Sequence, residues 1–251
     1  MICNGAVAWS AGQLGKDLGR NRQIAAAAVL VAAIAAPRAQ AAVDVSSFSV
    51  TPSTTLAGGH PNLGIRVAFP EPTTGVKDIT FHLPAGLSAN SSAFAYCSRR
   101  QLVRYICPPK SRLGSLSVLA VVYGIELPFR TDLYNMRPVA GERVRIGAPV
   151  PTPEKVLAAE LPIAERPEGG LGFAVTGLPQ NVAGVTVRVS KVEIWLKGTV
   201  RRKIRKRWRR RAFLTNPAAC IAATSVLELT TNDVPAALIT KTSSFTPTGC
   251  S

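Results

Sequence analysis

The chain has 251 residues, 47% of them hydrophobic and 18% charged, which is ample for a core in one all-β domain or two small ones. Its formal net charge is +16, but nine basic residues lie in one run, Arg201–Arg211. Outside this run and the first 41 residues, 17 basic and 13 acidic residues remain, so composition excludes a chain that is basic throughout.

Residues 1–41 have the pattern of an export signal. Three basic residues precede an uncharged run, Ile24–Ala36, and Ala39-Gln40-Ala41 matches a small-residue cleavage site. The run is shorter than the roughly 20 residues of a membrane-spanning helix. We expect a signal helix, cleavage before Ala42, and a secreted product that is extracellular or associated with the cell wall. An uncleaved N-terminal anchor is the alternative.

Residues 42–251 alternate short apolar segments with glycine- and proline-rich turns, which is typical of sandwiches and barrels. The clearest strand covers residues 76–83, where alternate residues are apolar and a Pro-Ala-Gly turn follows. We predict an all-β, antiparallel, Ig-like β-sandwich, as one or two sandwiches, over residues 42–251. The other predicted strands cover residues 43–50, 63–69, 113–123, 125–129, 144–150, 156–163, 171–178, 185–196, 222–231 and 237–245.

Two of these strands carry a further expectation. Residues 119–122 are apolar on both parities, which predicts a central strand covered on both faces. In residues 185–196 the phase of the alternation changes at Ser190-Lys191, which predicts a β-bulge. Two separate strands are the alternative for that segment.

Removal of the signal would leave four cysteines: Cys97, Cys107, Cys220 and Cys250. An even number in an exported chain indicates disulfides. Three pairings are possible, and proximity favours Cys97 with Cys107 and Cys220 with Cys250. The chain has no C-x-x-C motif, and its histidines lie far from the cysteines in sequence. We therefore expect no metal and no cofactor.

Several turn and cysteine motifs occur in a fixed order and resemble a group of exported, β-rich actinobacterial proteins. That group has the pattern AGxHPD…LPPGLxxNP…C…CPxxSxVG…VYNL…FLTNPTxC…TGC. The resemblance covers most of residues 42–251. It implies an exported β-sandwich with two sequential disulfides, and it implies no enzyme. The run Arg201–Arg211 is more basic than the pattern, and the chain is short for the group, so the resemblance does not extend to a partner. The segments that carry it are STTLAGGHPNL (53–63), VKDITFHLPAGLSAN (76–90), C…CPPKSRLG (97–114), LYNM (133–136), FLTNPAAC (213–220) and FTPTGC (245–250).

The basic run is the candidate anion-binding segment. Nine cations repel one another, so we expect it to be extended or mobile unless an anion neutralises it. Ile204 and Trp208 would share a face of a helix or a strand, which gives an apolar ridge flanked by cations. The first interpretation is a solvated excursion between two strands without a specific ligand. The alternative is binding to an anionic wall polymer or a membrane surface, and nucleic acid is not expected as a partner outside the cell. The candidate residues are Arg201, Arg202, Lys203, Arg205, Lys206, Arg207, Trp208, Arg209, Arg210 and Arg211.

No catalytic residue is predicted. His82 shares a predicted strand face with Asp78 and Thr80, as a general base oriented by a carboxylate would, but any half-buried strand has such a polar face. His60, between glycine and proline, is expected to cap or pack a loop. The leading hypothesis is an exported, non-enzymatic protein, structural or adhesive at the cell surface. The alternatives are a polyanion-binding module acting through residues 201–211 and a carboxylate-based hydrolase.

Overall fold

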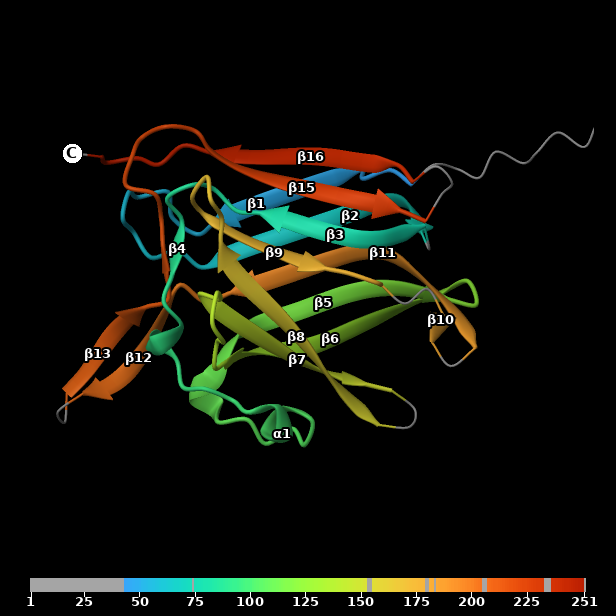
Figure 1. Cartoon of the computed structure of the whole chain (residues 1–251), viewed down its shortest axis with the longest axis horizontal. Coiled ribbons are helices and arrows are strands. Elements are labelled where there is room, and N and C mark those ends of the chain that lie inside the picture. Colours follow the sequence, from blue (N-terminus) through green and yellow to red (C-terminus); the bar gives the residue numbers. More distant parts are fainter. Residues whose placement is uncertain are drawn as a thin grey trace, which may run out of the picture. The chain divides into compact units, whose positions relative to one another are not determined.

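Figure 1 shows a computed structural model of the chain, which describes residues 43–73, 75–152, 155–178, 181–182, 184–204, 207–232 and 236–250. These residues belong to one compact unit. The predicted signal at residues 1–41 lies outside the described residues. Strands dominate, and the few helices are single short turns, so the predicted all-β class is confirmed.

The strands and short helices follow one another along the chain. They are β1 (Ser47–Pro52), β2 (Leu63–Thr73), β3 (Val76–His82), β4 (Ser88–Ala89), η1 (Ser91–Ala93), α1 (Arg99–Leu102), η2 (Pro109–Ser111), β5 (Arg112–Val122), β6 (Ile125–Met136), β7 (Val144–Pro151), β8 (Val156–Glu165), β9 (Leu171–Val175), β10 (Asn181–Val182), β11 (Val185–Leu196), β12 (Thr199–Ile204), β13 (Arg207–Ala212), β14 (Leu214–Thr215), β15 (Ala223–Thr231) and β16 (Leu238–Phe245). Each predicted strand has a counterpart, but β4, β10, β12, β13, β14 and the short helices were not predicted.

Most strands join one antiparallel sheet, hydrogen-bonded in the order β1-β2-β11-β5-β6-β7-β8-β9-β3-β15-β16, with β10 on β11 (Figure 1). Strand β8 pairs with β7 over most of its length and with β9 at its end, so it joins the two halves of the sheet. The outer strands β1 and β16 come together: Val50 N donates to Ser243 Oγ at 3.0 Å, and Lys241 pairs with Asp44 at 3.3 Å. The sheet is therefore nearly closed on itself.

The core lies between the two halves of this sheet. Alternate residues of β15 are buried, and Leu227 and Leu229 are fully inaccessible. Phe81 of β3 stacks on Phe173 of β9 with ring centroids 4.7 Å apart, and Phe48 lies 6.2 Å from Phe81. Each such side chain contributes about 1.5–3 kcal/mol when it leaves water. The period-2 pattern thus produces both the strands and their packing.

Two expectations about individual strands have different outcomes. Strand β11 is continuous and slips in register between Val189 and Lys191 against both β2 and β5, which is the predicted bulge. Residues 119–122 of β5 were expected to be covered on both faces, and this was wrong. Val121 is buried, but Leu119, Ala120 and Val122 are only half-buried.

Disulfides join Cys97 to Cys107 and Cys220 to Cys250, with Cα–Cα distances of 5.2 and 5.8 Å. This is the pairing that proximity favours. Such bonds persist in oxidising compartments, which indicates an environment outside the cytosol. In the part of the chain that the structure describes, no helix is long and apolar enough to cross a membrane.

Candidate anion-binding site

The basic run forms a β-hairpin. Strands β12 and β13 pair with each other in a two-stranded sheet separate from the main one (Figure 1). Thr199 lies opposite Ala212, and the register continues to Ile204 opposite Arg207. Within this ladder Arg201 lies opposite Arg210 and Arg202 opposite Arg209. Like charges directly across an antiparallel pair destabilise it, so another contribution must hold the hairpin.

That contribution is the base of the hairpin, which is fixed to the core. Phe213 N and Leu214 N both donate to Gly198 O, at 2.8 and 3.2 Å, so the two ends of the hairpin meet. Gly198 N donates to Asn62 Oδ1 at 2.9 Å. A Cβ on Gly198 would lie 2.0 Å from Pro61 O, so only glycine fits this approach. Phe213 and Leu214 are buried.

The strand that follows the hairpin is held on its other side. Leu214 pairs with Ala89 in the β4–β14 ladder, and Phe213 packs edge-on against Phe94 with centroids 5.4 Å apart. His60 Nδ1 lies 3.1 Å from Leu214 O and 3.2 Å from Thr215 Oγ1. His60 therefore has the structural position that was expected of it.

The candidate anion-binding residues divide into two groups. Arg205 and Lys206, between the two strands, lie outside the described residues. The others are exposed along the hairpin: Arg201, Arg202, Lys203, Arg207, Trp208, Arg209, Arg210 and Arg211. Trp208 is 56% exposed, and the Arg201 guanidinium lies over its ring at 5.8 Å from the centroid.

The described cations of the hairpin form no ion pair, whereas about half of the cations of the body do. Elsewhere in the described chain many basic side chains are paired with a carboxylate, as in Arg66–Glu193, Arg112–Asp132 and Arg145–Glu142. Across the residues that the structure describes, no arginine or lysine of the hairpin has a carboxylate oxygen within 4.0 Å. The positive potential of the hairpin is therefore open to an external anion.

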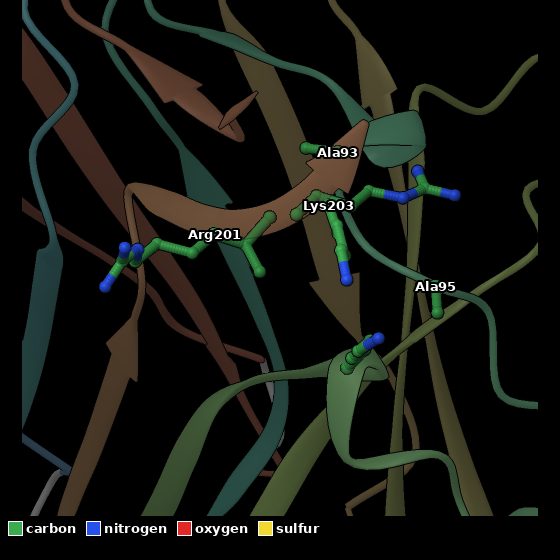
Figure 2. A pocket seen from close by; sticks show the side chains of 7 residues that line it. Ala93, Ala95, Arg201 and Lys203 are labelled. Atoms are coloured by element: carbon green, nitrogen blue, oxygen red, sulfur yellow. The ribbon is translucent and has the colours of Figure 1, made fainter. Parts of the chain in front are cut away.

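A pocket of about 170 Å³ lies where the hairpin meets the body. It is lined by β12, by the segment around η1 and by η2. In Figure 2, Lys203 points from β12 into the space beside Ala95, whereas Arg201 points away from it. The residues around the pocket are Ala93, Ala95, Lys110, Val200, Arg201, Arg202 and Lys203.

Three features of this pocket could not be found from the sequence: a bond of Arg202, the bonds of Asn135, and the position of Lys110. Arg202 Nη1 donates to Ser92 O at 3.1 Å, which ties the hairpin to the η1 segment. The buried Asn135 holds that segment from behind, because its Nδ2 donates to Ser91 O at 2.9 Å and to Ala95 O at 3.2 Å. Lys110 lies far from the basic run in sequence, and only the fold brings it to the same pocket.

His82 and Asp78, on the polar face of β3, have different partners in the described structure. Asp78 accepts from Gly177 N at 2.9 Å and from Thr230 Oγ1 at 3.0 Å, and the first of these bonds is the main cause that lowers the Asp78 pKa. His82 Nε2 lies 3.3 Å from Glu228 instead. Among the described residues, no group of three or more histidines, cysteines and acids is arranged to hold a metal ion.

Comparison with protein-family models, with curated proteins and with solved structures finds no match. The function is therefore inferred from the hairpin and the pocket beside it.

Proposed function

We propose that this chain is an exported, non-enzymatic β-sandwich protein that attaches to an anionic wall polymer through the β12–β13 hairpin. In this proposal the two halves of the nearly closed sheet form an Ig-like sandwich that carries the hairpin. The supporting observation is a row of exposed cations that have no acidic partner among the described residues, on a hairpin whose base is fixed at Gly198 and Phe213.

The geometry of a strand pair suits a linear polymer. Alternate residues of a strand share a face about 7 Å apart, and directly opposite residues lie about 5 Å apart. Arg209 and Arg211 therefore present neighbouring guanidinium groups on one face, with Arg202 opposite Arg209. Each guanidinium can hold a phosphate or carboxylate group with two parallel hydrogen bonds. A polymer that carries one anion per repeat can engage several of these groups at once.

Binding also relieves a cost of the free protein. Unit charges about 5 Å apart in water repel by about 0.8 kcal/mol, and the hairpin places arginine opposite arginine at two successive positions. A bound polyanion attracts each of these arginines and so offsets the repulsion between them. Because the base is held by the core, this repulsion does not separate the two ends of the hairpin.

A polymer fits the hairpin better than a lipid surface. Helices and hairpins that lie in a membrane interface bury an apolar face between their cations. Trp208 is the one large exposed apolar side chain among the described side chains of β12 and β13. A single ring provides little apolar area, whereas polymer binding requires only the cations.

Binding to a phosphodiester polymer tests the proposal. We would immobilise poly(glycerol phosphate) and compare the protein with the variant Arg209→Gln, Arg210→Gln, Arg211→Gln. A matched variant, Lys77→Gln, Lys155→Gln, Arg188→Gln, removes the same charge from exposed body positions. We expect the hairpin variant to elute early and the body variant to elute with the unmodified protein. Equal elution of the two variants would show that binding follows net charge and not the hairpin.

A second candidate function, structural or adhesive contact with another protein, is supported by the tip of the β5–β6 hairpin. Tyr123 is 82% exposed, Ile125 63% and Leu127 48%. An exposed group of apolar side chains is typical of a protein contact. Retention on cell walls stripped of anionic polymer, and its loss in Tyr123→Ser, Ile125→Ser, would favour this candidate.

A further inference from the structure

The pocket beside β12 combines cations from two distant parts of the chain. Lys203 comes from the hairpin and Lys110 from η2, and both side chains are exposed. Arg202 lines the same pocket and is held by Ser92 O. None of the residues that line the pocket is acidic. The charge of the pocket is therefore positive and is not compensated from within its own lining.

The walls are held in place before any ligand arrives. Ala95 N donates to Lys110 O at 3.2 Å, so the backbone of η2 is joined to the η1 segment. Asn135 fixes Ala95 O from the core, and the Cys97–Cys107 disulfide closes the loop that connects the two segments. Binding of an anion to a preformed pocket does not include the free-energy cost of ordering its walls.

The size of the pocket restricts what it can hold. Pockets for whole small molecules measure about 300–1,000 Å³. About 170 Å³ accommodates a single oxyanion group with a few waters. Ala93 and Ala95 add no large side chain to the lining, and the pocket is open to solvent, as a group within a longer chain requires.

We propose that this pocket binds one phosphate group of a phosphodiester polymer, with the ammonium groups of Lys110 and Lys203 as its ligands. The inference rests on the proposed function and names the class of polymer. Lysine is a common phosphate ligand that acts as a point charge, and it lacks the planar pair of donors with which a guanidinium group matches a carboxylate. The arginines of the outer hairpin then hold neighbouring groups, and the pocket fixes the position of one repeat.

Lys110→Gln tests the inference against the matched variant Lys155→Gln, an exposed lysine outside the pocket. The substitution leaves the Lys110 carbonyl and its bond from Ala95 N in place, so the fold should persist. Affinity is measured for poly(glycerol phosphate) and, at the same salt concentration, for poly(glutamate). We expect Lys110→Gln to weaken binding to the phosphate polymer by roughly tenfold or more, as for one charge-assisted hydrogen bond. For poly(glutamate), the affinity of Lys110→Gln should fall no more than that of Lys155→Gln. The variant Lys110→Arg should keep most of the affinity for the phosphate polymer.

The possible outcomes separate this inference from the proposed function. If Lys110→Gln and Lys155→Gln behave alike on both polymers while the triple hairpin variant still loses binding, the phosphate pocket is refuted and the polyanion function stands. If Lys110→Gln loses the same affinity for poly(glycerol phosphate) and for poly(glutamate), a phosphate site is also refuted. If no hairpin variant loses binding, the proposed function itself fails. A loss seen only with phosphatidylglycerol vesicles would assign the phosphate to a lipid and overturn the polymer.

Discussion

Neutralising one strand of the cationic hairpin should change how binding depends on salt. A protein that neutralises the phosphates of a nucleic acid releases condensed counterions, and the slope of log K against log salt is about −0.7 to −0.9 per neutralised phosphate; we take the same range for a phosphodiester polymer. With all nine cations of residues 201–211 engaged, the slope is about −6 to −8. Replacing Arg209, Arg210 and Arg211 by glutamine leaves six cations and a slope of about −4 to −5.

The difference is large enough to measure directly. Between about 50 and about 200 mM salt, three fewer released counterions reduce the loss of affinity by about 20- to 40-fold. Fluorescence anisotropy with end-labelled poly(glycerol phosphate) gives the dissociation constant at each salt concentration. The body variant Lys77→Gln, Lys155→Gln, Arg188→Gln should retain the original slope, because its substitutions lie outside the hairpin.

Two results would refute this reasoning. If the hairpin variant keeps the slope of the unmodified protein, the removed arginines release no counterions and do not touch the polymer. If the body variant shows the same shallower slope, the polymer contacts the whole surface and the hairpin is not a distinct site. In either case the unpaired cations of β12 and β13 would not account for binding to the polymer.

Three further predictions concern stability. Replacing residues 201–211 by a short Gly/Ser linker should keep or slightly raise the melting temperature, because it removes repelling charges and leaves the hydrogen bonds to Gly198 at the base of the hairpin. If the protein with the linker unfolds, the run is part of the core. Gly198→Ala should cost about 1–3 kcal/mol or more in chemical denaturation, because its Cβ would overlap Pro61 O; an unchanged midpoint would contradict this. The hydrogen bond from Arg145 is the main cause that lowers the Glu142 pKa from its ordinary value of 4.5. The ionised Glu142 side chain therefore stabilises the fold above pH 4.5, and this stabilisation is lost as the pH falls through the lower pKa of the folded state. Glu142→Gln should lower the melting temperature at neutral pH and flatten its fall in acid; a parallel fall would refute the role of the pair.

Local features of the fold were predictable because they depend on neighbouring residues. The alternation in residues 76–83 corresponds to β3, and the change of phase at Ser190-Lys191 corresponds to the bulge in β11. The exposure of Leu119 and Ala120 was not predictable from their apolar character. It depends on which distant elements pack on the faces of β5, and in the structure these residues are only half-buried.

The order of the sheet and the pocket depend on contacts between distant residues. Strand β11 lies between β2 and β5, although more than 60 residues separate it from either, and no short-range pattern specifies this. The basic run was evident from composition, but its partner Lys110 was not. An isolated lysine after two prolines resembles any surface lysine until the η1 segment and β12 are placed beside it.

The unpaired sides of the cationic hairpin have a consequence for self-association. Strands β12 and β13 form a two-stranded sheet in the described chain, so each leaves one backbone edge without a ladder partner. Such edges are templates on which a second molecule can add a strand, and natural proteins protect them with charged side chains. The arginines that we propose as polyanion contacts also make one hairpin repel another. The same residues therefore keep separate molecules apart in solution, and they do so without covering the edge with another element.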